Sequence, residues 1–158
     1  MANTASMCTS FMGELLTATH NFGTAPIRAV TTADTFKAAL YLTSATINAA
    51  TTAYTVTGEV SGTGYSAGGV AITNATPPTA TNSSATAGVA FFTPSASITY
   101  TSVTLATAFD TVLMYNSTQS NKAVAVYTFG SQTVTAGTFT LTMPSNTTTT
   151  ALLRLATT

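Results

Sequence analysis

The residues with the greatest chemical reactivity are the single histidine, His20, and the single cysteine, Cys8. A cysteine nucleophile needs a base within hydrogen-bond reach, and a zinc site normally needs three or four Cys, His or carboxylate ligands. On the helix expected in this segment, the two positions lie about 18 Å apart along the axis. The spacing argues against a Cys–His catalytic pair and against a metal site, and no cofactor is expected.

The four carboxylates offer a second chemistry, because a pair of Asp or Glu side chains can hydrolyse glycosidic bonds. They are Glu14, Asp34, Glu59 and Asp110, which lie in different expected elements. A glycan-cleaving site also needs aromatic platforms, and the chain has no tryptophan. A salt bridge with one of the basic residues is the favoured interpretation of each carboxylate, and the sequence predicts no enzyme.

A glycine-rich segment at residues 62–69 superficially matches a phosphate-binding loop. The third glycine of the dinucleotide fingerprint would fall at Ala67, and the residues that follow, Val70 to Ile72, favour a strand. No helix is therefore expected to point its N-terminus at a phosphate. Turns between two strands are the better interpretation.

Charge is scarce throughout the sequence. Lys and Arg number four, Asp and Glu number four, and the formal net charge is zero. Charged residues make up 5% of the chain, against about 25% in a typical soluble domain. Scattered basic residues do not form the positive patch that phosphate backbones require, so no nucleic-acid partner is expected. No membrane span or signal peptide is expected either, because the apolar runs are too short and the start lacks a basic region.

Threonine is the most frequent residue. Its branched β-carbon favours strands, and its hydroxyl can stay hydrated on an exposed strand face. A sheet without lysines at its edges also pairs readily with other chains. Two interpretations follow: the surface is kept in water by hydroxyls, or it packs against neighbouring subunits. The sequence favours the second.

A length of 158 residues predicts one domain, a β-sandwich over residues 1–158. A single cysteine excludes an internal disulfide. Met7, Phe11 and Leu15 follow one another at spacings of four, which predicts a short N-terminal helical segment over residues 5–20. Residues 74–87, with two prolines among Thr, Ser and Asn, are expected to form a long loop or arm.

The rest of the chain has the pattern of short strands bounded by Gly, Pro, Asn and Ser. The clearest is residues 138–143, where Phe139, Leu141 and Met143 alternate with threonines. About eight or nine such strands imply an all-β fold, an antiparallel β-sandwich or barrel of Ig-like or jelly-roll-like type. The expected strands are residues 36–43, 54–60, 69–73, 88–93, 97–105, 111–115, 123–129, 132–135, 138–143 and 151–156.

The run from Glu59 to Tyr65, Glu-Val-Ser-Gly-x-Gly-Tyr, with Gly68 and Gly69 after it, resembles a segment of small structural proteins of tailed bacteriophages. The resemblance covers about residues 8–155. It implies a virion component without enzymatic activity and carries over no catalytic residue. The other matching parts are an N-terminal helix, a strand like residues 38–43, a late strand like residues 112–116, and a closing pair like residues 123–130 and 137–143.

The resemblance and the uncharged surface together predict a capsid decoration or cement protein that stabilises the head. Its expected partners are the major capsid protein or other virion proteins, and itself as a dimer or trimer. The expected location is the virion, assembled in the host cytoplasm. One alternative is a tail, collar or fibre component. A second is a cell-surface or glycan-binding β-domain whose shallow site is lined by Tyr54, Tyr65, Tyr100 and Tyr115.

Two apolar terminal segments are the tentative interface. An apolar helix at a terminus either covers the core, which is the favoured interpretation, or docks onto another chain. The residues chosen are Met7, Phe11 and Leu15 in the first segment, and Leu152, Leu153 and Leu155 in the second.

Overall fold

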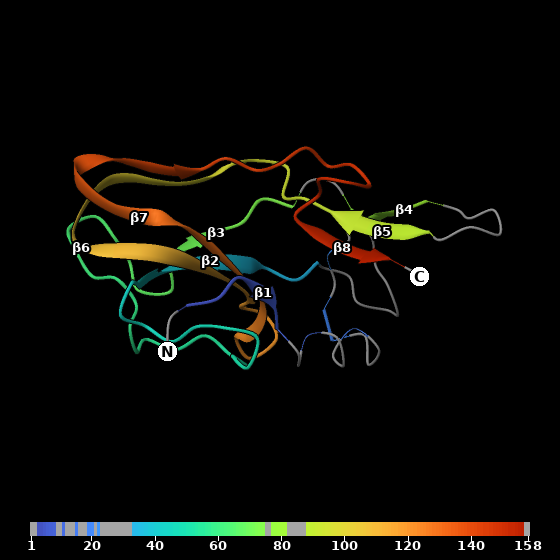
Figure 1. Cartoon of the computed structure of the whole chain (residues 1–158), viewed down its shortest axis with the longest axis horizontal. Coiled ribbons are helices and arrows are strands. Elements are labelled where there is room, and N and C mark those ends of the chain that lie inside the picture. The colour runs from blue at the N-terminus through green and yellow to red at the C-terminus, as the bar shows by residue number, and fades with distance from the viewer. Residues whose placement is uncertain are drawn as a thin grey trace. The chain divides into compact units, whose positions relative to one another are not determined.

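The fold is all-β and antiparallel, as the sequence predicts. The computed structural model describes residues 3–8, 11, 15, 19–20, 22, 33–74, 77–81 and 88–156. Its strands form two open sheets, neither of which closes into a barrel (Figure 1). The strands are β1 Ser6–Met7, β2 Phe36–Leu42, β3 Val70–Ala71, β4 Thr79–Ala80, β5 Val89–Phe92, β6 Ile98–Asn116, β7 Lys122–Leu141 and β8 Leu153–Ala156.

The chain divides into two compact units, each assembled from three separate stretches. The first unit contains residues 1–20, 34–72 and 98–140, and the second contains residues 21–33, 73–97 and 141–158. The first holds a sheet of order β1-β7-β6-β2-β3, and the second a sheet of order β4-β5-β8. A single sandwich domain over the whole chain stays a prediction.

Strand β2 is the centre of the first unit. Its sequence, FKAALYL, is an almost continuous apolar run, and Ala38 to Tyr41 are fully buried. Such a run is typical of a strand that is covered on both faces. β2 pairs with β6 from Phe36↔Asn116 to Leu42↔Phe109, and with β3 through Lys37 and Ala38. This pairing confirms the expected strand at residues 36–43.

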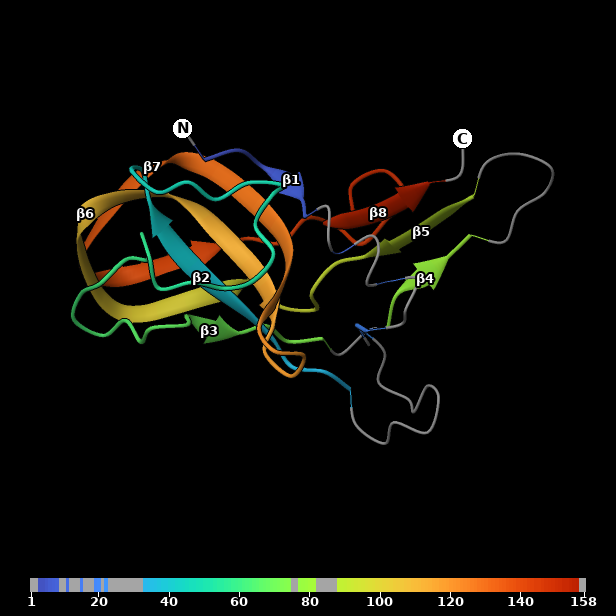
Figure 2. The ribbon, with the colours of Figure 1, turned by 90° about the horizontal axis from the view of Figure 1, so that it is seen from below.

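Strands β6 and β7 are long and sharply bent. In β7 the rings of Phe129 and Phe139 lie 5.4 Å apart, although ten residues of straight strand would separate them by about 33 Å. Figure 2 shows both strands curving around the first unit. Positive φ angles at Ser102 in β6 and Ala136 in β7 mark local departures from extended backbone, as at bulges. Phe109 of β6 packs edge-on against both phenylalanines, so the bend encloses an aromatic core.

The second unit is small. In its sheet, β5 lies between β4 and β8, and its register with β8 runs from Val89↔Ala156 to Phe92↔Leu153. Phe92 and Leu153 are buried, and Phe92 lies 5.1 Å from the ring of Phe22. β5 and β8 confirm the strands expected at residues 88–93 and 151–156.

Several expectations from sequence need correction. The N-terminal helix does not span residues 5–20 as predicted, because Ser6–Met7 form β1 and pair with Val126 and Ala125. Phe11 and Leu15 are helical, and most of the other residues of that segment lie outside the described residues. Residues 54–60 form a bend and a turn with one isolated bridge, Glu59 to Tyr41, instead of a strand. The stretches 97–105 and 111–115 are one strand, β6, and those from 123 to 141 are one strand, β7. The expected loop at 74–87 contains β4, and its residues 75–76 and 82–87 are not described.

Candidate functional site

The most organised polar site of the first unit surrounds Glu59, a half-buried carboxylate. Its Oε2 accepts a hydrogen bond from the Tyr54 hydroxyl at 2.6 Å, and its Oε1 accepts from the Tyr65 hydroxyl at 2.7 Å and from the Gly68 N–H at 2.8 Å. The Tyr115 hydroxyl donates to the Gly68 carbonyl at 2.8 Å. We call these five residues the Glu59 cluster. Three donors satisfy the carboxylate, and none of these donors among the described residues is a basic side chain.

The Glu59 cluster is fastened to the central strand. The Tyr65 hydroxyl accepts from the Leu40 N–H at 3.0 Å, and the Tyr100 hydroxyl donates to the Ala38 carbonyl at 2.8 Å. The Tyr65 hydroxyl therefore links the strand to the carboxylate, since it accepts from one and donates to the other. Such chains of hydrogen bonds fix the relative positions of turn and strand.

The glycines of the motif are required by close backbone approach. A β-carbon at Gly69 would overlap the Ala38 carbonyl of β2, and one at Gly62 would overlap the Thr104 carbonyl of β6. Gly69 also has a φ of +68°, which is costly for any residue with a β-carbon. The segment is thus a packed pair of turns, with Tyr65 N–H donating to the Gly62 carbonyl and Gly69 N–H to the Ser66 carbonyl. This agrees with the prediction of turns rather than a phosphate loop.

The environment of the tyrosines favours their neutral form. Burial, followed by the hydrogen bond to Glu59, raises the pKa of Tyr65 far above its ordinary value. Burial likewise raises the pKa of Tyr100, with a smaller contribution from the negative charge of Glu59. Neither hydroxyl is therefore suited to act as a base or nucleophile near neutral pH.

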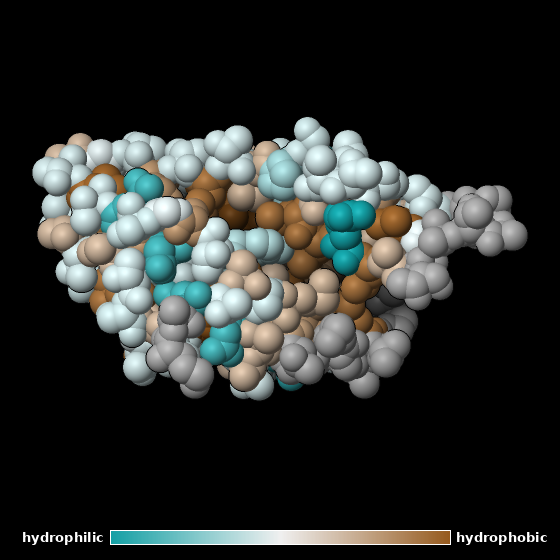
Figure 3. All heavy atoms as spheres, viewed as in Figure 1, coloured by the Kyte–Doolittle hydropathy of each residue, from teal (hydrophilic) through white to brown (hydrophobic). Residues whose placement is uncertain are grey.

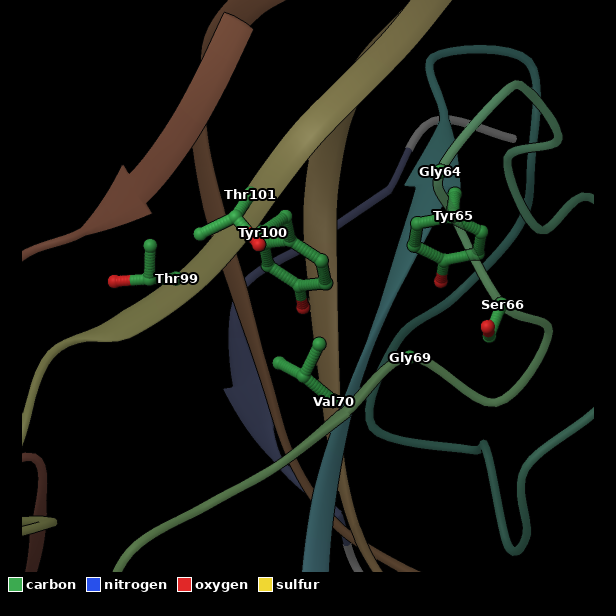
Figure 4. A pocket seen from close by; sticks show the side chains of 8 residues that line it. All are labelled: Gly64, Tyr65, Ser66, Gly69, Val70, Thr99, Tyr100 and Thr101. Carbon is green, nitrogen blue, oxygen red and sulfur yellow. The ribbon is translucent and has the colours of Figure 1, made fainter.

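A hollow of about 150 Å³ opens beside the Glu59 cluster, between residues 64–70 and the start of β6. Figure 4 shows Tyr65 and Tyr100 facing each other in this hollow, with Val70 below them. Their ring centroids are 5.9 Å apart, and the rings of Tyr54 and Tyr115 are 4.9 Å apart. These are the tyrosines chosen for a sugar site, and they stack on one another. This geometry does not favour the glycan alternative.

A second polar cluster involves His20. Asn116 Oδ1 accepts from the N–H groups of Thr118 and Gln119, both at 3.1 Å, and this fixes the orientation of its amide. Asn116 Nδ2 therefore donates to Asp34 Oδ2 at 2.7 Å and to His20 Nδ1 at 3.1 Å. The His20 ring proton must then be on Nε2. The ring also packs 4.8 Å from Phe11, so the histidine is a buried structural residue of this unit.

The described carboxylates, Asp34, Glu59 and Asp110, have different hydrogen-bond partners. Asp110 accepts hydrogen bonds from Asn3 Nδ2 at 2.9 Å and from the Thr111 hydroxyl at 2.7 Å. Salt bridges were expected for Asp110 and Glu59, but their donors here are amide N–H groups and hydroxyls. Glu14 lies outside the described residues. In the part of the chain that the structure describes, no group of three or more His, Cys, Asp or Glu side chains is placed to hold a metal ion. Cys8 is buried.

The tentative interface residues lie in different environments. Phe11 and Leu153 are buried, and Met7, Leu15 and Leu152 are partly exposed. The Leu152 N–H donates to the Thr93 hydroxyl at 3.0 Å. Leu155 is 44% exposed. Burial of Phe11 fits the favoured interpretation of the first segment as core cover, and Leu155 is the residue of this set with most free surface.

The outer surface of β6 and β7 is covered by uncharged polar side chains. No charged residue occurs in the sequence between Lys122 and Arg154. In Figure 3, pale residues of intermediate hydropathy cover much of the visible face of the chain, with brown and teal residues between them. We call the exposed surface of β6 and β7 the hydroxyl face. Its exposed residues are Thr99, Thr101, Ser102 and Thr107 in β6, and Thr128, Ser131, Gln132, Thr133, Thr135, Thr138 and Thr140 in β7.

Comparison of the chain with protein-family models, with curated proteins and with solved structures finds no match. Among the described residues, no helix has the length and apolar character needed to cross a membrane.

The sequence did not predict the Glu59 cluster. Its donors are two tyrosines and a backbone N–H between five and nine residues from Glu59, all in turns, where no periodic pattern applies. The available signal was a lone carboxylate between two tyrosines in a chain with few charges. Such a carboxylate must find hydroxyl or backbone donors when it is partly buried.

Proposed function

We propose that this chain is a structural protein of a tailed-phage virion, and that it acts as a capsid decoration or cement protein stabilising the head. The observation that carries the proposal is the hydroxyl face, because none of the exposed residues of β6 and β7 is charged. The motif around Glu59 adds support, because its residues serve to hold turns and strand together rather than to do chemistry.

An uncharged threonine surface is well suited to burial against another protein. Burying an unpaired charge costs far more than burying a hydroxyl that finds one hydrogen-bond partner. Threonine side chains also lose little rotamer freedom, because their χ1 is already restricted. Many such contacts between major capsid subunits would together resist internal pressure. The main alternative for this surface is simple hydration of its hydroxyls.

The rigid interior supports the same role. Buried Tyr100 and Phe109 pack with Phe139, and the Glu59 cluster ties the turns to β2. A cement protein must transmit load without deforming, and a densely packed aromatic core has low compressibility. The finer assignment, a single Ig-like or jelly-roll-like sandwich domain, belongs to this proposal, and an experimental structure of the pure protein should show two layers packed face to face.

Copy number in the particle tests the proposal. Quantitative mass spectrometry of purified virions should find this chain at a copy number close to that of the major capsid protein. A handful of copies would overturn decoration and favour the tail, collar or fibre alternative. Complete absence from virions would overturn the structural role, and binding on a glycan array would then favour the cell-surface alternative.

A charge placed on the hydroxyl face gives the matched control. Thr133→Glu should lower the copy number in virions, because the new carboxylate must be desolvated in the contact. Thr57→Glu makes the same change at an exposed turn position outside β6 and β7. This control should leave the copy number in virions unchanged. Equal copy numbers for both variants would show that the hydroxyl face is only hydrated.

A further inference from the structure

We infer that the outer edge of β8 joins two copies of this chain, by antiparallel pairing of β8 with β8 of a second copy about a two-fold axis at Leu155. The inference rests on the proposed function in one respect, because it gives the expected self-association a surface. β8 is the last strand in the order β4-β5-β8, so within the described residues its outer edge has no strand beside it.

The register of the sheet shows which backbone groups point outward. Thr81 N–H donates to the Val89 carbonyl at 3.0 Å, and Val89 N–H donates to Thr81 Oγ1 at 3.0 Å, so Val89 is directed towards β4. Neighbouring residues of a strand direct their backbone groups to opposite sides. Ala90 is therefore directed towards β8, where it is opposite Leu155.

The same alternation applies along β8. Leu153 and Leu155 bond to β5, which leaves the N–H and C=O groups of Arg154 and Ala156 directed at the outer edge. An axis at Leu155 places Arg154 opposite Ala156 of the second copy. Residues that face each other in this way exchange both N–H···O=C bonds. The symmetric register thus satisfies every outward group of Arg154 and Ala156.

The side chains match the same axis. Ala80, Ala90 and Leu155 are cross-strand neighbours in register, and they form a row on one face of the sheet. The inner part of that face holds buried Phe92 and Leu153, whereas the outer part borders a hollow of about 440 Å³ and Leu155 is 44% exposed. Across the axis, Leu155 meets its own copy as a non-hydrogen-bonded pair, the arrangement in which side chains are closest. The row then continues across six strands.

Electrostatics permit this pairing. Arg154 is the only charged residue of β8 and faces Ala156 of the second copy rather than another arginine. β8 also lacks the proline that natural edge strands often use to prevent association. The formal net charge of the chain is zero, so long-range repulsion between copies is small. A second copy is therefore the occupant that the edge fits.

Sedimentation equilibrium of the full chain tests the pairing. The unaltered protein should be a dimer that dissociates on dilution. Leu155→Lys sets two ammonium groups opposite each other and should weaken the dimer by at least about tenfold. Val56→Lys, at a side chain that is 68% exposed in the first unit, is the matched control and should leave association unchanged. A monomer at all concentrations, a trimer, or equal association in both variants would overturn the inference.

Crosslinking gives a second measurement that depends little on folding stability. Leu155→Cys should form a disulfide-linked dimer under mild oxidation, because the facing β-carbons of a non-hydrogen-bonded pair are about 4.5 Å apart, which a disulfide can span. Val56→Cys should form no disulfide-linked dimer, and Cys8 is buried. Crosslinking of both variants alike, or of neither, would contradict the register. A monomeric protein that is present in virions would overturn the dimer but not the proposed function. A dimer that is absent from virions would overturn the proposed function but not the dimer.

Discussion

At the scale of single residues, Glu59 is the carboxylate that links the turns of the first unit. Three hydrogen bonds converge on its carboxylate, from Tyr54, Tyr65 and the Gly68 N–H. The two tyrosines also stack on Tyr115 and Tyr100, so the polar contacts and the aromatic packing share the same side chains. Removal of the Glu59 carboxylate should therefore disturb both the hydrogen bonds and the aromatic stacking.

Substitution of Glu59 tests this dependence. Glu59→Ala leaves two hydroxyls and one N–H without their acceptor and should lower the free energy of unfolding by about 3 kcal/mol. Glu59→Gln keeps one carbonyl oxygen as an acceptor and should cost about 1 kcal/mol. Urea unfolding followed by circular dichroism measures both values. Equal stability of the two variants would show that the carboxylate is merely solvated.

At the scale of elements, two glycines have opposite roles. Gly69 packs against the carbonyl of Ala38 with a positive φ, whereas nothing lies within 4 Å of the position that a β-carbon would take at Gly130 in β7. The first glycine is required by contact between a turn and β2. The second is open to substitution.

Alanine at each glycine makes a matched pair of variants. Gly69→Ala should destabilise the protein by about 3 kcal/mol or more, because the left-handed conformation and the overlap with backbone add together. Gly130→Ala should change the free energy of unfolding by no more than about 0.5 kcal/mol. Thermal or urea unfolding compares them, and a neutral Gly69→Ala would refute the close packing of the turn.

Elements were predictable from sequence where their pattern is local. β2 was predicted because its apolar run is bounded by polar residues, and the alternation of Phe139 and Leu141 with exposed threonines was correct. The length of β7 was not predicted, because Thr135, Ala136 and Gly137 were expected to form a turn. In the structure the chain bends there but remains in the strand. β1 was missed because two residues show no periodicity. Met7 shares the helical spacing of Phe11 and Leu15, which are helical, although Met7 itself lies in β1.

At the scale of the whole molecule, buried tyrosines should set the upper pH limit of the fold. Burial raises the pKa of Tyr41, Tyr65 and Tyr100 above the value of about 10 that they have in the unfolded chain. The folded state then retains protons that the unfolded state releases. The stability from these groups is fully present below about pH 10 and is lost as the pH rises further.

Alkaline titration measures this limit. Stability should be constant up to about pH 10 and should fall steeply above it, and tyrosinate absorbance should appear together with the loss of the circular dichroism signal. Tyr65→Phe removes one titrating group and should make the fall less steep. Appearance of all tyrosinate absorbance near pH 10 with the fold intact would contradict the burial of the hydroxyls.

The assembly of each unit from three separate stretches determines when the chain can fold. β2 cannot pair until β6 has been synthesised, and its partners in β6 follow about 70 positions later. β1 likewise cannot pair until residues 125–126 of β7 have been synthesised. During synthesis neither sheet can close until most of the chain has left the ribosome. Contacts between such distant residues slow folding and leave strand edges unpaired for longer. A newly made chain with almost no charge to keep copies apart therefore depends on prompt closure of β6 and β7 to avoid aggregation.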